Sequence, residues 1–143
     1  MNKKVAAVVV LYNPDKNYIK NINTYLYHVS LLVIVDNSEI PDYSVYSSLE
    51  NINHIKFVIN KENTGISKAI NDGIKIAVKE GFEWVLTMDQ DSFFENNMIE
   101  ILYLKGYFTA GQPAGNRVFC GNYPVNRINN LRDSYLPFLE VNI

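Results

Sequence analysis

Apolar residues in this chain alternate between unbroken runs and stripes with helical spacing. Unbroken runs rich in β-branched residues are typical of parallel strands that are covered on both faces. Stripes that repeat about every three or four residues are typical of helices with one buried face. We therefore predict strands at residues 5–12, 31–35, 55–59 and 84–88, and helices at residues 15–29 and 66–78.

The order of these elements predicts the fold class. Strand and helix alternate along the chain, which predicts an α/β sandwich with a mainly parallel sheet and right-handed crossovers. Gly81 follows the longest apolar stripe at the position where a helix commonly ends in glycine. Shorter helices are expected at residues 44–49 and 95–104. Between residues 106 and 121, glycine, proline and asparagine are as frequent as in loops, so a loop is expected there.

Each predicted strand ends in a polar cluster. Ligands of open α/β folds bind outside the carboxyl ends of the strands. A single cluster has a simpler explanation, because Asn, Asp and Ser favour turns. Four clusters in succession, each directly after a buried strand, favour a shared pocket of the size of a nucleotide. These clusters are residues 12–14, 36–38, 60–65 and 89–92.

The last polar cluster carries two carboxylates, Asp89 and Asp91, at the end of an apolar strand. Residues two positions apart in an extended chain point to the same side, so these carboxylates are expected to converge if the extended conformation continues to Asp91. Converging carboxylates can bind Mg²⁺, with substrate phosphates completing the coordination shell. The alternative is a solvated turn, because an Asp-x-Asp pattern alone is a weak signal.

Composition limits the functions that the chain can have. With 143 residues, 48% of them hydrophobic, the chain suits one domain of ordinary size. A net charge of −2 argues against general affinity for nucleic acid or for an anionic membrane surface. The single cysteine, Cys120, cannot form an internal disulfide, which fits a reducing compartment. The apolar run at the start ends without a small-residue cleavage site, so we do not interpret it as a signal peptide.

Four motifs follow one another in a distinctive order. They are Val8-Val9-Val10-Leu11-Tyr12-Asn13-Pro14, Val35-Asp36-Asn37-Ser38, Asn63-x-Gly65-Ile66-x-x-Ala69-x-Asn71-x-Gly73-Ile74, and Trp84-Val85-Leu86-Thr87-Met88-Asp89-Gln90-Asp91-Ser92. In this order they resemble the donor-binding half of family 2 glycosyltransferases of GT-A fold, and the last motif resembles bacterial rhamnosyltransferases. The resemblance implies a Rossmann-like three-layer α/β/α domain. Its nucleotide-sugar-binding core would be residues 5–104, and residues 105–143 would begin an incomplete acceptor-side region.

The resemblance also implies an activity. Family members transfer a sugar with inversion from a nucleotide diphosphate donor, here with Mg²⁺ or Mn²⁺, to a glycan or lipid-linked acceptor in surface polysaccharide biosynthesis. The first expectation for the donor is dTDP-rhamnose, and a UDP-sugar is the alternative. The expected location is the cytoplasm or the cytoplasmic side of the inner membrane. An incomplete acceptor half would leave apolar surface exposed, which predicts self-association as a homo-oligomer.

The resemblance implies roles for individual residues of the clusters. Asp91 is expected to be the direct metal ligand, and Asp89 is expected to face the donor ribose and the water shell of the metal. The carboxylate of Asp36 can accept a hydrogen bond from a pyrimidine imide N–H. Tyr12 and Asn13 are expected to frame the base.

The third cluster and the helix after it supply the other expected donor-binding residues. Asn63 and Gly65 are expected to bring the backbone close to the nucleoside, since glycine has no side chain. Asn71 completes the expected donor site. Two alternatives remain open, because Asp36 also suits an Asx turn and Asn71 and Gly73 also suit helix packing.

The sequence does not identify a general base. Inverting transfer needs a group that deprotonates the acceptor hydroxyl, and family members carry this carboxylate in their acceptor-binding half. After Glu100 the chain contains only Asp133 and Glu140 as carboxylates, and we interpret both as surface charges. The expectation is therefore a donor half from a truncated product, with transfer by this chain alone in question.

Two other classes of protein also gather aspartates at strand ends. A phosphoryl-transfer α/β domain places paired acids after its first strand, where this chain has Tyr12-Asn13-Pro14 instead. A non-catalytic module that only binds nucleotide sugars would use the same clusters as an enzyme. The second class stays open, and turnover of a nucleotide sugar would distinguish it from a transferase.

Overall fold

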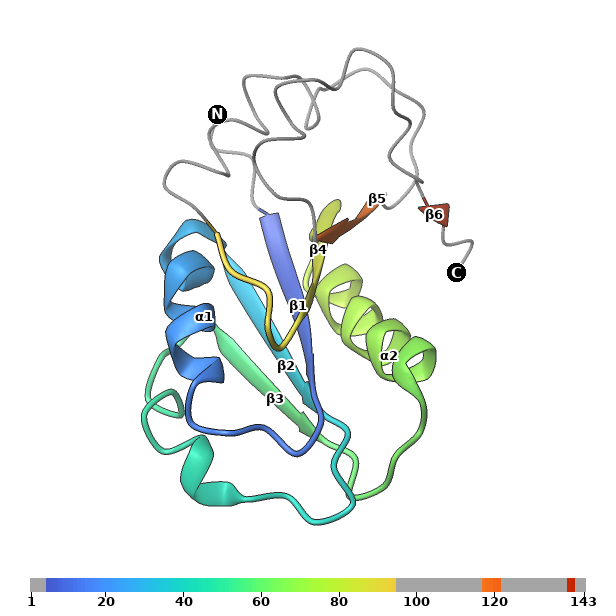
Figure 1. Ribbon diagram of the computed structural model, residues 1–143. Coiled ribbons are helices and arrows are strands. Elements are labelled where there is room, and N and C mark those ends of the chain that lie inside the picture. The colour runs from blue at the N-terminus through green and yellow to red at the C-terminus, as the bar shows by residue number, and fades with distance from the viewer. Residues whose placement is uncertain (1–4, 95–116, 122–138, 141–143) are drawn as a thin grey trace, which may run out of the picture.

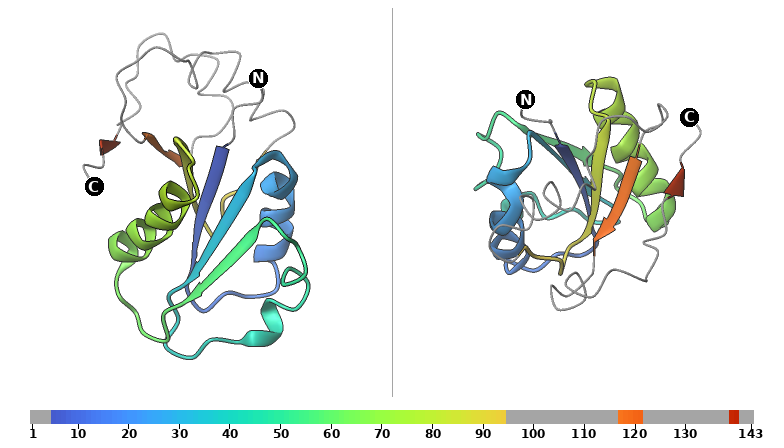
Figure 2. Two further views of the ribbon diagram at one scale, coloured as in Figure 1. Left: turned by 180° about the vertical axis from the view of Figure 1, so that it is seen from behind. Right: turned by 90° about the horizontal axis from the view of Figure 1, so that it is seen from above.

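The computed structural model describes residues 5–94, 117–121 and 139–140. It forms a sheet with helix α1 on one face and helix α2 on the other (Figures 1 and 2), which confirms the predicted three-layer α/β/α class. Along the chain the elements are β1 (Val5–Leu11), α1 (Tyr18–Tyr25), the 3₁₀ turn η1 (Leu26–His28), β2 (Leu31–Asp36), the 3₁₀ turn η2 (Tyr43–Val45), β3 (Ile55–Ile59), α2 (Ile66–Lys79), β4 (Trp84–Asp89), β5 (Arg117–Gly121) and β6 (Leu139–Glu140).

In the sheet, β1 lies between β2 and β4. The order is β3-β2-β1-β4-β5-β6, and every neighbouring pair except β5 and β6 is parallel. In this register Leu11 lies beside Asp36, and Val10 lies beside Asp89. The carboxyl ends of β1, β2, β3 and β4 therefore meet along one border of the sheet, which we call the carboxyl edge.

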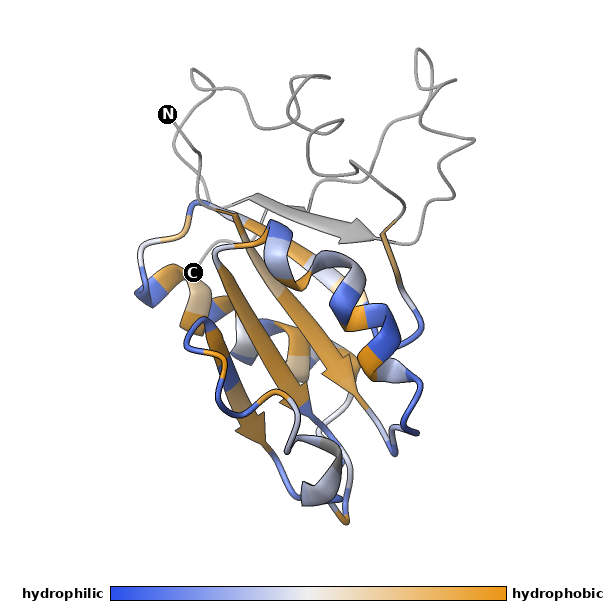
Figure 3. Ribbon diagram, turned by 90° about the vertical axis from the view of Figure 1, so that its left-hand side faces the viewer, coloured by the Kyte–Doolittle hydropathy of each residue, from blue (hydrophilic) through white to orange (hydrophobic). Residues whose placement is uncertain are grey.

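The unbroken apolar run of β1 is explained by burial on both faces of the sheet. Val5, Ala7, Val9 and Leu11 belong to the core under α1, whereas the alternate residues belong to the core under α2. Figure 3 shows the strands as mostly apolar and the helices as a mixture of polar and apolar residues. A strand that is covered twice has no solvated face, so its sequence does not alternate.

Helix α2 lies close to the sheet because of a glycine. A Cβ atom added to Gly73 would lie 2.4 Å from Cγ1 of Val8 and 3.1 Å from Cγ2 of Val35. Any side chain at this position would push the helix away from β1 and β2. Of the two interpretations of Gly73, helix packing is therefore confirmed.

The end of α2 also follows the sequence prediction. Gly81 has a φ of 85°, a conformation that glycine adopts without a Cβ clash. Its N–H donates to the carbonyl of Val78, and the N–H of Phe82 donates to the carbonyl of Ala77. This pair of bonds is the Schellman motif, which satisfies the last carbonyls of the helix.

Three sequence predictions differ from the structure. The helix predicted at residues 15–29 is shorter, because its regular part is Tyr18–Tyr25 and its end tightens into the η1 turn. Residues 44–49 do not form the predicted helix, and a 3₁₀ turn at Tyr43–Val45 stands there instead.

The third difference is β5, which lies within the predicted loop at residues 106–121. It pairs in parallel with β4, and this tertiary partner overrides a loop-like local composition. The helix predicted at residues 95–104 lies outside the described residues. None of the helices in the described part of the chain is long and apolar enough to span a membrane.

Candidate functional site

The four polar clusters predicted from the sequence are joined by hydrogen bonds at the carboxyl edge. The N–H of Tyr12 donates to Oε1 of Gln90 over 2.8 Å, which links the first cluster to the fourth. The N–H of Asn13 donates to Oγ of Ser38 over 2.8 Å, which links the first cluster to the second. Asn37 links the second cluster to the third. The clusters therefore form one continuous site rather than four separate turns.

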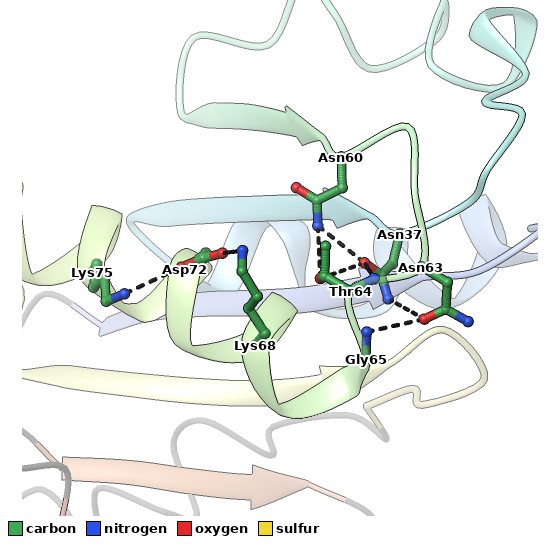
Figure 4. A network of polar contacts seen from close by, with 8 residues as sticks. All are labelled: Asn37, Asn60, Asn63, Thr64, Gly65, Lys68, Asp72 and Lys75. Carbon is green, nitrogen blue, oxygen red and sulfur yellow. Dashed lines mark hydrogen bonds and ion pairs between the residues drawn. The ribbon is translucent and has the colours of Figure 1, made fainter.

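Asn37 is the centre of the largest polar network at this edge (Figure 4). Its Oδ1 accepts hydrogen bonds from Nδ2 of Asn60 at 3.0 Å and from the N–H and hydroxyl of Thr64 at 3.1 and 2.9 Å. Its Nδ2 donates to Oδ1 of Asn63 at 3.0 Å. The side chain is buried, with 3% of its residue surface exposed. One amide thus holds the end of β2, the end of β3 and the approach to α2 together.

The third cluster ends at the first turn of α2. Oδ1 of Asn63 also accepts from the N–H of Gly65 at 3.0 Å, so its acceptor is used within the loop. Gly65 has a φ of 82° at the position that caps α2, and open space surrounds the place of a Cβ atom. The glycine is therefore required by backbone conformation, and it leaves the backbone accessible to a ligand.

Asp36 is the last residue of β2 and is almost fully buried, with 1% of its surface exposed. Its Oδ1 accepts a hydrogen bond from the N–H of Ser38 at 2.8 Å, which is an Asx turn. Its Oδ2 is also buried, yet it has no hydrogen-bond partner among the described residues. The Asx turn is thus present, but it uses one carboxylate oxygen only. A buried oxygen without a partner is costly, which favours a ligand N–H as its partner.

Tyr18 is a neighbour of Asp36 that the sequence analysis did not single out. It is buried at the start of α1, and burial together with the negative charge of Asp36 raises the pKa of its hydroxyl to about 12. The effect shows that the field of the Asp36 carboxylate reaches the α1 side of the sheet. No pattern in the sequence predicts that Tyr18 lies near Asp36, because Tyr18 is only one position of the apolar stripe that predicts the helix.

The acidic turn follows β4. The N–H of Asp89 donates to Oγ of Ser92, and the N–H of Ser92 donates to the carbonyl of Asp89 at 3.0 Å. Partial burial, and next the negative charge of Asp91, raise the pKa of the Asp89 carboxyl above its ordinary value. The two carboxylates therefore lie close enough to repel each other, although β4 ends at Asp89 and Asp91 lies in the turn, not in the extended chain that the prediction assumed.

These two carboxylates fit a divalent cation of the Mg²⁺ type. A cation between them would remove their repulsion, and such ions are commonly held by one or two carboxylates together with substrate phosphates. Within residues 5–94, 117–121 and 139–140, no group of three or more His, Cys, Asp or Glu side chains is placed to hold a metal. Asp89 and Asp91 could supply part of the shell of such a cation, and the phosphates of a substrate could supply the rest.

Of the other predicted site residues, two lie in the loop after β1 and one lies in α2. Tyr12 is exposed, and its hydroxyl donates to Oε1 of Glu39 at 3.4 Å. Asn13 has a φ of 45°, which asparagine tolerates better than most residues. Asn71 is exposed in the second turn of α2, and no hydrogen bond joins it to the network among the residues that the structure describes.

The structure therefore brings most of the predicted residues to the carboxyl edge and adds others. The predicted residues at this edge are Tyr12, Asn13, Asp36, Asn63, Gly65, Asp89 and Asp91. Those that the sequence analysis did not assign are Asn37, Ser38, Asn60, Thr64 and Gln90. The signal for them was their place inside the motifs, but only the fold shows which partners they have.

Comparison with known proteins agrees with this geometry. Residues 8–136 match the family model for glycosyl transferase family 2. The chain is 32% identical over 106 residues to the dTDP-rhamnosyl transferase RfbF of Shigella flexneri, covering 71% of this chain and 34% of that protein. It is 38% identical over 63 residues to the bifunctional glycosyltransferase pgtA of Dictyostelium discoideum, covering 42% of this chain and 8% of that protein. The α/β chain, which spans about a third of the length of RfbF, belongs to glycosyltransferase family 2.

Proposed function

We propose that the carboxyl edge binds a nucleoside diphosphate sugar and that this domain serves the transfer of that sugar to a glycan or lipid-linked acceptor. The observation that carries the proposal is the buried Oδ2 of Asp36, which has no partner among the described residues. The first candidate for the donor is dTDP-rhamnose, because the similar RfbF is named a dTDP-rhamnosyl transferase. Surface polysaccharide would be the final product.

The chemistry of Asp36 favours thymine or uracil over cytosine. An ionised carboxylate only accepts hydrogen bonds. Thymine and uracil carry an imide N–H that donates, whereas the corresponding ring nitrogen of cytosine accepts. A free Oδ2 in a buried position would therefore bind the first two bases and repel the third. Tyr12 and Asn13 lie on the neighbouring strand end, where they can contact the base and its sugar.

The diphosphate would lie toward the acidic turn, where Asp91 and Asp89 would hold Mg²⁺ or Mn²⁺. When bound, such a cation neutralises the charge that develops on the departing diphosphate. The chain's own contribution is to place both carboxylates at and just after the end of β4, with β1 between β4 and the strand that carries Asp36. Asn63, Gly65 and Asn71 are proposed to line the nucleoside from the third cluster and α2.

The general base for the acceptor hydroxyl is still unassigned. Asp133, one of the two carboxylates after Glu100, lies outside the described residues. Release of nucleoside diphosphate from dTDP-rhamnose in the presence of an acceptor is the readout that distinguishes a transferase from a binding module. The donor site itself can be tested without an acceptor.

The sharpest test of the donor site is Asp36→Asn. The Asx turn to Ser38 requires an oxygen acceptor, so the new amide oxygen would take the place of Oδ1. The amide nitrogen would then take the place of Oδ2 and would donate rather than accept. We expect the variant to lose affinity for dTDP and to gain affinity for dCDP, so that the preference between the two bases reverses in calorimetric titrations.

A matched control is Asp42→Asn, because Asp42 forms an exposed Asx turn to Ser44 at 3.0 Å outside the four clusters. This control should keep the preference of the wild type for dTDP. An Asp36→Asn variant that folds and binds dTDP and dCDP in the same ratio as the wild type would contradict the proposed role of Asp36.

A further inference from the structure

Gln90 lies between the two carboxylates of the acidic turn and makes two contacts with separate elements. Its side-chain Oε1 accepts a hydrogen bond from the N–H of Tyr12 at 2.8 Å. Its backbone carbonyl accepts a hydrogen bond from Nδ2 of Asn21 in α1 at 3.0 Å. The first bond reaches the loop after β1, and the second reaches a helix on one face of the sheet. Gln90 is therefore placed to transmit the position of the acidic turn to the loop after β1.

The loop after β1 is held from its other side as well. The N–H of Asn13 donates to Oγ of Ser38, which is fully buried. The N–H of Ser38 donates in turn to Oδ1 of Asp36. Three hydrogen bonds, joined by the backbone from Tyr12 to Asn13 and by Ser38, therefore connect Gln90 of the acidic turn with the Asp36 carboxylate, which is proposed to bind the base.

This path follows the strand order. Because β1 lies between β2 and β4, its loop separates the Asp36 end of the site from the acidic end. A nucleoside diphosphate with its metal would contact both ends at once. Two contacts within one ligand reinforce each other only if the two ends of the site are held at a fixed separation. The side chain of Gln90 supplies the connection on the acidic side.

We propose that Gln90 is a positioning residue whose side-chain bond to Tyr12 couples metal binding at the acidic turn to recognition of the base at Asp36. The inference rests on the proposed function, because it needs both ends of the donor site. Gln90 touches neither the metal nor the base in this scheme. Its effect is a coupling between two subsites, and such a coupling acts equally in both directions.

A purely structural role for Gln90 makes a different prediction. If Gln90 only keeps the acidic turn folded, then any bond that holds the turn should matter equally. Asn21→Ala removes the bond from α1 to the backbone of Gln90 and leaves the bond to Tyr12 in place. Gln90→Leu removes the bond to Tyr12 and keeps the backbone carbonyl that Asn21 contacts. These two variants therefore separate coupling from folding of the turn.

The measurement is calorimetric titration of dTDP into each protein, in Mn²⁺ and again in excess chelator. The ratio of the two affinities reports how strongly the metal aids nucleotide binding. In Gln90→Leu we expect this ratio to fall by about five- to tenfold, the factor that one ordinary hydrogen bond contributes. The affinity in chelator should change by less than about twofold, and Asn21→Ala should keep the ratio of the wild type.

Several outcomes would overturn the proposal. An unchanged ratio in Gln90→Leu would show that the bond to Tyr12 carries no coupling, while leaving the donor site intact. An equal fall in Asn21→Ala would assign both residues to folding of the turn. A wild-type ratio of one would instead contradict the metal part of the proposed function, and the coupling with it. Gln90→Met, which keeps the length of the side chain, replaces the leucine variant if that variant melts at a lower temperature than the wild type.

Discussion

The two ends of the carboxyl edge are built in opposite ways. The base end, comprising residues 36–38 and 60–65, is mostly a network of neutral amides and hydroxyls whose central members are buried. The acidic end, residues 89–92, carries two carboxylates that repel each other at an exposed turn. The base end is therefore complete before a ligand arrives, except at Oδ2 of Asp36. The acidic end gains its balancing charge only when a cation and phosphates bind.

The difference assigns separate tasks to the two ends. A rigid network of hydrogen bonds can discriminate between bases, because a wrong base leaves a buried polar group unpaired. Exposed carboxylates discriminate little between ligands. Once they hold a divalent cation, that cation binds the phosphates of a ligand strongly. We therefore expect substitutions at the base end to affect folding and base recognition, and substitutions at the acidic end to affect only the response to metal.

The largest expected effect follows removal of the centre of the amide network. Asn37→Ala leaves the groups that Asn37 contacts in Asn60, Asn63 and Thr64 without their shared partner. We expect a loss of about 3 kcal/mol in the free energy of unfolding, since the four hydrogen bonds of the buried Asn37 amide are lost and each contributes about 0.5–1.5 kcal/mol. Urea denaturation measures the loss. Asn23→Ala on the exposed side of α1 is the matched control and should cost almost nothing.

The second effect separates the two ends directly. Asp91→Asn removes the proposed metal ligand without touching the network at the base end. We expect dTDP affinity in Mn²⁺ to fall by about 2 kcal/mol, the order of one lost contact to a charged group. Thymidine affinity should stay at its wild-type value, and the melting temperature should not fall, because the repulsion between the two carboxylates is removed. A variant that binds thymidine less well, with unchanged response to Mn²⁺, would show that the ends are assigned the wrong way round.

The smallest effect is a shift in pH dependence. Because partial burial and the charge of Asp91 raise the pKa of Asp89, its carboxyl holds a proton at a higher pH than an ordinary Asp does. A proton on Asp89 competes with the metal, so Mn²⁺ affinity should rise with pH through this raised pKa. The repulsion between the two carboxylates works in the opposite direction on stability. Protonation of Asp89 removes this repulsion and so stabilises the folded protein. The gain in stability is complete below the ordinary pKa of Asp and is lost as the pH rises through the raised pKa of Asp89.

Titration of Mn²⁺ between pH 4 and 7, in the presence of dTDP, checks the pH effect. The matched variant is Asp91→Asn, in which the neighbouring charge is absent. Its remaining Mn²⁺ binding should begin to weaken at a lower pH than that of the wild type. Identical pH profiles in the two proteins would show that Asp91 does not influence the carboxyl of Asp89.

The sequence predicts the part of the molecule that depends on burial. The run from Val5 to Leu11 is apolar throughout because both faces are covered, so its strand is evident from local pattern alone. The four polar clusters are evident for the same reason, since a polar residue after such a run marks the end of the apolar strand. The acidic turn is predictable because Asp89 and Asp91 come directly after a buried apolar strand, but the strand ends at Asp89, so a turn and not strand alternation places Asp91.

The sequence does not predict features that depend on partners far along the chain. Asn37 acts as a centre only because β2 and β3 are adjacent, and Gln90 reaches Tyr12 only because β4 lies beside β1. The predicted strand stops at residue 35, whereas β2 continues to Asp36, because Asp36 pairs with Leu11 of β1 and Ile59 of β3. β5 forms where β4 offers a partner, although its own composition resembles a loop.

The central claim is that one nucleoside diphosphate spans both ends of the carboxyl edge. The most direct measurement is a crystal structure of the chain grown with dTDP and Mn²⁺, with the anomalous signal of manganese used to locate the metal. We expect manganese bound to the carboxylate of Asp91 and the thymine imide N–H donating to Oδ2 of Asp36. A complex in which dTDP lies elsewhere, with Oδ2 of Asp36 still without a partner, would contradict the account.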